Sequence, residues 1–371
     1  MAKLGDIATY INGYAFKPQD WSDEGIPIIR IQDLTGNSYQ ANRYNGEYAS
    51  KYEVNDGDVL ISWSASLGIY IWHGEKAVLN QHIFKVVFDK ERISKDFFVH
   101  QVGLILENAA SDAHGATMKH LTKPVFDALP FYLPPYEKQC EIAEVLDKVT
   151  SLISLRKQQL AKLDELVKAR FVEMFGDPVV NSKRWPVETI ENHIDLLTGF
   201  PFDSSGYVSK GINICGGLII TPQKIDWSAC KHWPQVTGYE DYILRPNDIV
   251  IALDRPWISN GFKIAMVDKE HLPALLIQRT ARIRAVDINQ HYLMQSLLLG
   301  RFDKHCNITG SLVPHISPKD IKSYSIMIPP IELQNQFASF IERVNQQKQT
   351  VQQSLEKLEL MKKALMQEYF G

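Results

Sequence analysis

The chain contains a long internal repeat. Residues 134–176 and 329–371 align without gaps at a shift of 195 positions, and 15 of the 43 aligned pairs are identical. Average residue usage would give roughly two or three identities by chance. Nearer the N-terminus, a shift of 186 aligns "GYAF" at 13–16 with "GFPF" at 199–202. The chain is therefore a tandem duplication, and the change of shift indicates insertions inside each half.

Both copies of the repeat carry an apolar stripe whose members advance in steps of four and three, the spacing of a coiled-coil seam. The predicted seam residues are Ile142, Leu146, Val149, Ile153, Leu160, Leu163, Val167, Phe337, Ile341, Val344, Val351, Leu355, Leu358 and Leu365. The polar members of the stripes are Arg156, Arg170, Lys348 and Lys362, of which the two arginines are interpreted as register-setting or partner contacts. Two such stripes in one chain most simply bury each other.

Each stripe is preceded by Pro-Pro, which suits the start of a helix, and ends near a glycine, Gly176 or Gly371. About 40 residues at ~1.5 Å each make a helix of roughly 60 Å. The segments before the helices contain short β-type runs, "DVLISW" at 58–63 and "DIVIAL" at 248–253, which indicate small α/β domains. The predicted division is 1–135, 136–176, 177–330 and 331–371.

Composition excludes several classes of protein. The 371 residues are 45% hydrophobic and 22% charged, which fits two or three globular domains. No apolar run approaches the ~20 residues of a membrane span, and no signal sequence precedes the first domain, so we expect a cytoplasmic protein without a membrane partner. The four cysteines lie far apart, so neither disulfides nor a metal site is expected. A net charge of −3 argues against nonspecific coating of nucleic acid but allows local basic clefts.

Pro-Pro-Tyr at 134–136 could instead be a fragment of a methyltransferase active-site motif. That motif needs Asn or Asp before the prolines to bond the amino group that is methylated, and an aromatic ring after them. Leu133 and Ile328 occupy the polar position, and Ile331 replaces the ring in the second copy. No catalytic and no cofactor-binding residues are therefore predicted.

Several phrases in this order closely resemble the specificity (S) subunits of Type I restriction-modification systems. They include "LGDIATYINGYAFKPQDW" at 4–21, "DGDVLISWSASLG" at 56–68, "LNQHIFKV" at 79–86 and "FVEMFGDP" at 171–178. The resemblance covers essentially the whole chain. The second half matches less closely, because "DRPWISNG" at 254–261 has no counterpart in the first half.

The resemblance implies an α+β (mixed α/β) fold: two target-recognition domains separated by two long antiparallel coiled-coil helices with a pseudo-twofold internal repeat. Such a subunit is not an enzyme. Each domain reads one half of a bipartite sequence in double-stranded DNA, and the helices set the spacer and bind two modification (M) subunits. S-adenosylmethionine is expected on the M subunits and no cofactor on this chain. A motor-nuclease (R) subunit can join them.

Arg and Lys suit guanine, Asn and Gln suit adenine, and hydroxyl groups suit phosphate, so polar residues in the loops are the candidates for DNA binding. In the first half they are Asn12, Tyr14, Lys17, Ser62, Ser64, Ser66, Asn80, Gln81, His82, His114, Thr117 and Lys119. In the second half they are Ser204, Arg255, Ser259, Asn260, Lys263, Gln278, Arg279, Arg282 and Ser311.

Other roles compete for some of these positions. Phe16 and Phe202 recur at equivalent sites and are interpreted as core, and the repeated His120 and His315 as structural hydrogen-bonding residues. Gln81 and Gln278 could maintain the fold or face DNA, the three serines could form a solvated strand edge, and Arg279 or Arg282 could pair with a carboxylate.

Two functions of a different class also compete. A free-standing methyltransferase or nuclease is disfavoured because no Gly-rich cofactor loop and no carboxylate cluster with a lysine is evident. A coiled-coil scaffold that does not bind DNA is the other alternative. Within the first class, the protein could serve a phase-variable or nuclease-free methylation system instead, and the neighbouring open reading frames distinguish these.

Overall fold

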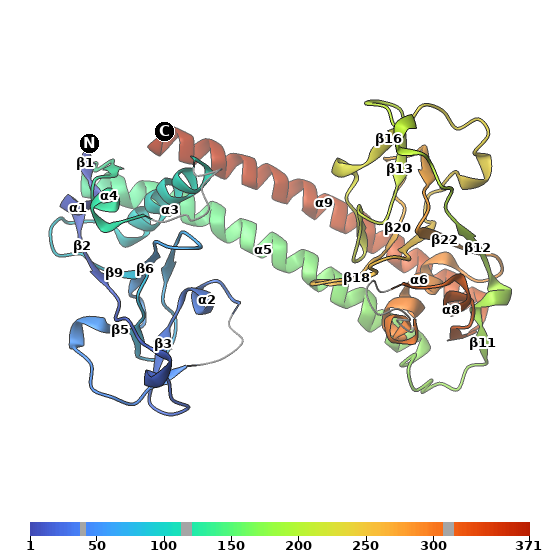
Figure 1. Cartoon of the computed structure of the whole chain (residues 1–371), viewed down its shortest axis with the longest axis horizontal. Coiled ribbons are helices and arrows are strands. Elements are labelled where there is room, and N and C mark those ends of the chain that lie inside the picture. Colours follow the sequence, from blue (N-terminus) through green and yellow to red (C-terminus); the bar gives the residue numbers. More distant parts are fainter. Residues whose placement is uncertain (38–41, 113–120, 307–314) are drawn as a thin grey trace. The chain divides into compact units, whose positions relative to one another are not determined.

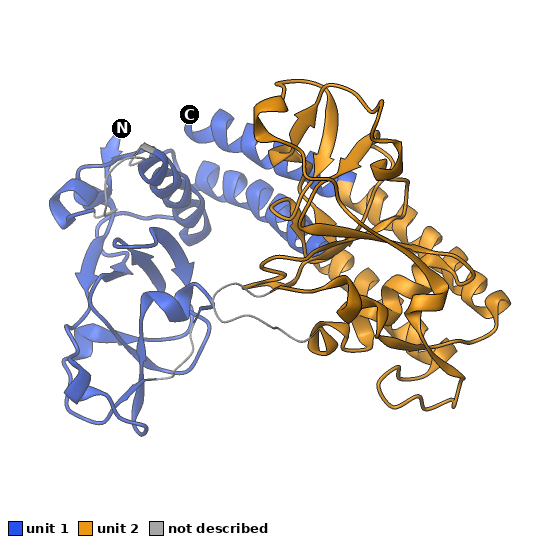
Figure 2. Cartoon of the chain, turned by 45° about the vertical axis from the view of Figure 1, so that its right-hand side comes forward, with its two compact units in different colours: residues 1–157, 353–371 blue, residues 158–352 orange. Residues whose placement is uncertain are grey.

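The computed structural model describes residues 1–37, 42–112, 121–306 and 315–371. These residues form two compact units, unit 1 with residues 1–157 and 353–371 and unit 2 with residues 158–352 (Figures 1 and 2). Two 40-residue helices, α5 (Tyr136–Phe175) and α9 (Ile331–Phe370), contribute residues to both units. Within the described residues, no helix is both long enough and apolar enough to cross a membrane.

The described part of unit 1 has two four-stranded sheets. The first, ordered β2-β9-β6-β7, is antiparallel throughout, and the second, ordered β4-β3-β8-β5, contains the parallel pair β3 and β8. The strands are β1 (Ala2–Lys3), β2 (Thr9–Asn12), β3 (Ile26–Ile29), β4 (Arg43–Tyr44), β5 (Glu53–Val54), β6 (Val59–Ser62), β7 (Gly68–Ile71), β8 (Ala77–Leu79), β9 (Ile83–Val87) and β10 (Pro130–Phe131). The shorter helices are α1 (Leu4–Ile7), α2 (Ile31–Leu34), α3 (Lys95–Asp112) and α4 (Lys123–Asp127).

Unit 2 repeats this topology. Its four-stranded antiparallel sheet is ordered β12-β22-β17-β20, and the parallel pair β13 and β21 lies in a second sheet with β16. The strands are β11 (Val187–Thr189), β12 (Ile194–Thr198), β13 (Ile212–Cys215), β14 (Ile220–Thr221), β15 (Lys224–Ile225), β16 (Lys231–Trp233), β17 (Ile249–Ala252), β18 (Trp257–Ile258), β19 (Gly261–Phe262), β20 (Ile264–Met266), β21 (Ala274–Leu276), β22 (Thr280–Ala285) and β23 (Ser325–Met327). The shorter helices are α6 (Gln290–Leu299), α7 (Phe302–His305) and α8 (Pro318–Lys322). The duplication of a mixed α/β half is thus confirmed.

A repeated glutamine fixes the start of each long helix. Gln139 Nε2 donates to the Pro134 carbonyl at 2.9 Å, and its Oε1 accepts from the backbone N–H of Ser94 just before α3. Gln334 makes the same two bonds in unit 2, to the Pro329 carbonyl at 2.7 Å and from the Asn289 N–H before α6 at 2.8 Å. Both glutamines are 1% exposed, so these amides satisfy buried backbone groups and join each long helix to its globular domain.

The two long helices pack together inside each unit. In unit 1, Ile142 and Leu146 near the start of α5 share a core cluster with Leu365 and Tyr369 near the end of α9. Arg156 Nε lies 3.3 Å from Ser354 Oγ, as expected for a register contact.

In unit 2, Leu163 and Val167 pack with Phe337 and Ile341, and Lys348 pairs with Asp164 at 2.6 Å. The predicted seam residues that are buried are Ile142, Leu146, Val149, Leu163, Val167, Phe337, Ile341, Val344, Val351 and Leu355. The half-buried ones are Ile153, Leu160, Leu358 and Leu365.

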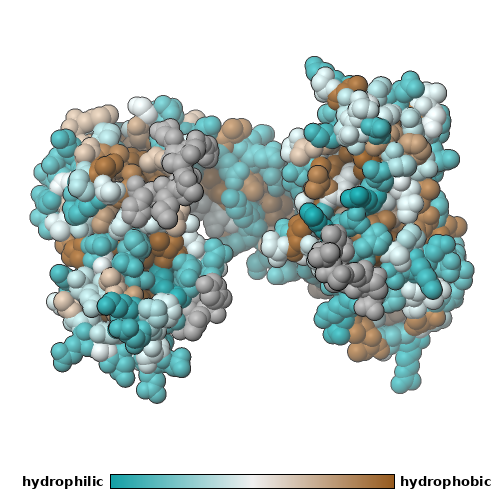
Figure 3. All heavy atoms as spheres, viewed as in Figure 1, coloured by the Kyte–Doolittle hydropathy of each residue, from teal (hydrophilic) through white to brown (hydrophobic). Residues whose placement is uncertain are grey.

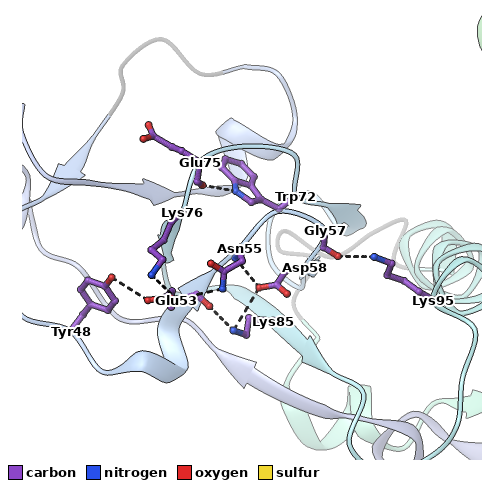
Figure 4. A network of polar contacts seen from close by, with 10 residues as sticks. All are labelled: Tyr48, Glu53, Asn55, Gly57, Asp58, Trp72, Glu75, Lys76, Lys85 and Lys95. Carbon is purple, nitrogen blue, oxygen red and sulfur yellow. Dashed lines mark hydrogen bonds and ion pairs between the residues drawn. The ribbon is translucent and has the colours of Figure 1, made fainter.

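A polar network closes one end of the first sheet of unit 1 (Figure 4). Lys85 Nζ bonds the Glu53 carbonyl and lies 3.7 Å from Asp58, and Lys95 at the start of α3 donates to the Gly57 carbonyl at 2.9 Å. The Glu53 carboxylate pairs with Lys76 at 3.1 Å, and this hydrogen bond holds the pKa of Glu53 below its ordinary value. The network connects β5, β9, α3 and the loop before β6.

Candidate nucleic-acid interface

The opposite end of the same sheet gathers three loops. Because the strands are antiparallel, the ends of β2 and β6 lie beside the starts of β9 and β7, and Ser62 pairs with both Ile83 and Gly68. Residues 12–17, 62–68 and 80–83 therefore meet at one edge, called here sheet end 1. Most of the candidates of the first half lie in these three segments.

Backbone hydrogen bonds fix the loops of sheet end 1 to one another. The Gln81 N–H donates to the Tyr14 carbonyl at 2.8 Å, and the Trp63 N–H to the His82 carbonyl at 3.2 Å. The Trp63 indole also donates to Asn12 Oδ1 at 3.1 Å. The polar side chains are thus displayed on a fixed backbone.

Unit 2 builds the same edge, sheet end 2, from residues 198–204, 252–263, 277–280 and 315–316. The Gln278 N–H donates to the Phe200 carbonyl at 2.8 Å, and the Leu253 N–H to the Arg279 carbonyl at 2.9 Å. His82 and Arg279 thus hold equivalent positions, and both have left-handed backbone, with φ of 72° and 64°. The two halves place different side chains on one repeated turn.

The repeated "GYAF" and "GFPF" motifs are explained by close packing at these edges. A Cβ on Gly13 would lie 1.9 Å from the Asn80 carbonyl oxygen, and one on Gly199 would lie 2.0 Å from the Ile277 carbonyl oxygen. Only glycine permits this approach. Phe16 and Phe202, three residues later, are buried at 7% and 4% exposure, which confirms their interpretation as core.

The structure divides the candidates of the first half by exposure. Tyr14 is 45% exposed and Ser62 is fully buried, with its hydroxyl bonded to the Ser64 carbonyl. Ser62 is therefore removed from the predicted DNA contacts. The exposed candidates are Asn12, Tyr14, Lys17 and Ser66, and the half-buried ones are Ser64, Asn80, Gln81 and His82.

In the second half the exposed candidates are Ser204, Arg255, Ser259, Asn260, Gln278 and Arg279. Ser259 and Asn260 form the turn between β18 and β19, so the insertion "DRPWISNG" is a short hairpin that leaves the end of β17. This hairpin gives sheet end 2 polar groups that sheet end 1 does not share.

The space-filling view shows hydrophilic residues over much of one face of each unit (Figure 3).

Two cationic candidates of the second half require correction. Lys263 is 6% exposed, its ammonium bonds the Gly217 carbonyl, and burial lowers its pKa. Arg282 is 4% exposed and pairs with Asp195, the alternative left open by the sequence. Lys263 lies between β19 and β20 and Arg282 lies on β22, and each side chain is held by a partner within unit 2. Because their charged groups are paired and largely buried, both residues are removed from the predicted DNA contacts.

The acidic residue Asp254 pairs with Arg279, one of the exposed cations of sheet end 2. Its Oδ2 lies 3.3 Å from Arg279 Nε, and its Oδ1 lies 2.6 Å from His315 Nδ1. The side chain of Arg279 remains 75% exposed. The structural hydrogen bond expected of His315 is therefore present. The candidates His114, Thr117, Lys119 and Ser311, together with His120, lie outside the described residues.

The described residues offer little for catalysis. Among them, no group of three or more His, Cys, Asp or Glu side chains could hold a metal ion. Burial raises the pKa of the Cys306 thiol to about 12 and that of the Tyr324 hydroxyl to about 12, so both groups stay protonated. The exposed groups at the sheet ends are donors and acceptors suited to binding.

The fold and its two sheet ends define a duplicated mixed α/β protein with one polar sheet end in each half. The family model described as "Type I restriction modification DNA specificity domain" matches residues 1–165 and 235–360, and the chain belongs to this family. The Type I restriction enzyme MjaVIII specificity subunit of Methanocaldococcus jannaschii is 24% identical to this chain over an alignment 389 residues long, gaps included. The alignment covers 99% of this chain and 90% of the relative. That relative is named a specificity subunit.

Two solved structures share the fold. The Type I restriction-modification S subunit from M. genitalium has a TM-score of 0.60 at 12% identity, covering 100% of this chain and 95% of its own. A chain from a structure on complex assembly and conformational transition of the type I R-M system has a TM-score of 0.53 at 15% identity, covering 100% and 96%. At these identities the likeness concerns the fold alone.

Proposed function

We propose that this chain is the sequence-specific DNA-recognition subunit of a Type I restriction-modification complex and that each globular domain reads one half of a bipartite target. The observation that carries the proposal is the repetition of one backbone frame with different polar side chains, as at His82 and Arg279. A frame that is kept while its side chains differ suits two readers of two different base sequences.

The domain division follows the helix starts. Residues 1–135 and 177–330 are the two target-recognition domains, and residues 136–176 and 331–371 are the two helical segments. The helices form an antiparallel coiled coil with pseudo-twofold symmetry, since the start of α5 packs with the end of α9 in unit 1 and the end of α5 with the start of α9 in unit 2. Their overlap sets the number of base pairs between the half-sites.

The helices and their junctions also bind two M subunits, and an R subunit can join them. The duplication supports this part of the proposal, because Gln139 and Gln334 build two equivalent helix–domain junctions. S-adenosylmethionine and the methyl transfer to adenine belong to the M subunits. This chain determines which DNA sequence is methylated.

The DNA contacts are made by the exposed and half-buried candidates of the two sheet ends, without Ser62, Lys263 and Arg282. Amide groups such as Asn80 and Gln278 suit adenine edges, and exposed cations such as Lys17 and Arg255 suit phosphates. The competing functions predict different results. A free-standing methyltransferase would modify DNA without a partner, and an inert scaffold would leave the assembled complex without sequence-dependent affinity.

A domain exchange tests the proposal. Residues 1–133 are replaced by the same region of a relative, the variant is assembled with its M subunit in a host without other adenine methylation, and the methylated motif is mapped. We expect one half of the methylated motif to change. The other half, and the pattern of methylation on the two DNA strands, should persist. A change in both halves, or methyl transfer by the purified chain alone, would rule the proposal out.

A further inference from the structure

We propose that the target-recognition domain of unit 2 reads a guanine in the major groove through Arg279, with Asp254 and His315 as positioning residues. The inference rests on the proposed function and adds to it the identity of one base in one half-site. It starts from the question of which cation of unit 2 is able to leave the protein surface and contact a base.

The backbone of Arg279 is fixed by a hydrogen bond, whereas its side chain is exposed. Its carbonyl accepts the Leu253 N–H at 2.9 Å, and the preceding Gln278 N–H is bonded to the Phe200 carbonyl. The turn is therefore fixed to the ends of β12 and β17. The left-handed φ of 64° at Arg279 is shared by His82 at 72°, so this conformation belongs to the repeated turn and sets where the side chain leaves it.

Asp254 orients the guanidinium for a base with two acceptors. It takes the Nε side of the group at 3.3 Å, and among the described residues no hydrogen bond reaches the two terminal nitrogens. Those nitrogens form a planar pair of donors that matches the O6 and N7 acceptors of guanine. Adenine presents an amino donor at the position of O6, so the same pair of donors would be opposed there.

His315 fixes the carboxylate from the other side. A carboxylate oxygen only accepts, so the contact of 2.6 Å means that His315 Nδ1 donates a hydrogen to Asp254 Oδ1. The two residues are also paired as an isolated antiparallel bridge. Asp254 thus has one oxygen hydrogen-bonded to His315 and the other ion-paired with Arg279.

The neighbouring cations are excluded or differently suited. Lys263, Arg282 and Arg284 bond the Gly217 carbonyl, Asp195 and Asp248 inside the domain. Arg255 is exposed, but no carboxylate is recorded beside its guanidinium among the described residues, so it suits a phosphate. In unit 1 the equivalent of Arg279 is His82, whose ring cannot present two parallel donors to one base edge. The guanine contact therefore belongs to the half-site of unit 2 alone.

The experiment uses the chain assembled with its M subunit and duplexes that carry the mapped motif. The half-site of unit 2 is the half that persists in the exchange of residues 1–133. Each guanine in it is replaced singly by 7-deazaguanine, which pairs normally but lacks the N7 acceptor. We expect one replacement to weaken binding of the wild-type complex by roughly 5- to 150-fold. Arg279→Ala, which removes the contacts to both acceptors, should show at least as large a loss on the unmodified duplex and no further loss on the modified one.

Further variants separate orientation from folding. Asp254→Asn should reduce the ratio of affinities for the unmodified and 7-deazaguanine duplexes while leaving thermal unfolding unchanged, and His315→Gln should act in the same direction with a smaller effect. Lys269→Ala, which removes one exposed charge from the loop between β20 and β21, is the matched control and should leave the ratio intact. If Arg279→Ala binds too weakly to measure, Arg279→Lys keeps the charge and tests the same ratio.

The inference is overturned if the half-site contains no guanine, or if Arg279→Ala weakens unmodified and modified duplexes by equal factors. Neither result would change the outcome expected of the domain exchange, so the proposed function would stand. If the exchange itself fails to change half of the motif, the proposed function falls instead.

Discussion

Sheet end 1 and sheet end 2 have one backbone and two chemistries. In both, a glycine packs closely against a backbone carbonyl. In both, the carbonyl of a residue with left-handed backbone also accepts a hydrogen bond from the first N–H after an apolar strand. Sheet end 1 places Asn12, Trp63 and His82 on this frame, whereas sheet end 2 places Asp254 and Arg279 there. Duplication has preserved what fixes the loops and changed what they display. The parts that repeat therefore belong to the fold, and the parts that differ are the candidates for recognition.

The comparison also distinguishes structural cations from exposed ones. Lys85 on β9 and Arg282 on β22 occupy corresponding positions, and each is largely buried and paired, with Asp58 and Asp195 respectively. A paired cation at this position is thus common to both halves. A basic stretch of sequence does not by itself locate a DNA contact.

The largest effect is expected from breaking the shared frame. Gly13→Val and Gly199→Val each place side-chain atoms against a backbone carbonyl and should destabilise their own unit by about 3 kcal/mol or more. Denaturant unfolding measures the loss, and mapping of methylated adenines should show that specificity fails for the corresponding half-site first. Gly103→Ala in α3, where the nearest atom is 3.7 Å from the added Cβ, is the control and should be neutral or stabilising.

The next effect separates the two kinds of cation in unit 2. Arg284 makes two hydrogen bonds of 2.7 Å to Asp248, which is 2% exposed, and these bonds raise the pKa of Arg284. Arg284→Ala removes the charged partner of that buried carboxylate and leaves it the backbone N–H of Arg245, and should cost about 3–5 kcal/mol of unfolding free energy. Arg279→Ala and Arg255→Ala should change stability by less than about 0.5 kcal/mol. Equal losses in all three variants would contradict the division.

A smaller effect tests phosphate binding at both sheet ends. Arg255→Ala and Lys17→Ala should each reduce the slope of log binding constant against log salt by about 1, because one fewer counterion is released. Titrations of the assembled complex at several salt concentrations measure the slope. Neither substitution should alter the methylated motif. A lost base preference with an unchanged slope would assign the residue to base reading instead.

The smallest effect is expected at the opposite end of the first sheet of unit 1. The pKa of Glu53 is lowered, chiefly by the hydrogen bond from Lys76, from an ordinary value of 4.5. A lowered pKa in the folded state stabilises the protein above the ordinary value, and this contribution is lost as the pH falls through the lower, folded pKa. The stability advantage of the wild type over Glu53→Gln should therefore be present at neutral pH and shrink below pH 4.5. A difference that is constant with pH would show that the charge is not responsible.

Much of the architecture could be predicted from the sequence because its signals are local. The 4,3 stripes gave the buried helix faces, and the Pro-Pro and terminal glycine gave the helix bounds within a residue or two. The role of Gln139 and Gln334 was available in part, since they are identical in the repeat, but their acceptors and donors lie up to 45 residues away. The resemblance supplied the family, and the family model matches it.

The sequence by itself determined that this protein is built twice, with a mixed α/β half followed by a long helix, because periodicity and repetition are properties of the chain alone. Only the tertiary structure decided which polar residues are available to a ligand. Arg282 and Arg279 stand three residues apart and look alike in sequence. One is buried on Asp195, 87 residues away, and the other is exposed beside Asp254. Strand pairing is long-range, so the direction of a side chain at a strand end is fixed by partners that no local pattern reveals.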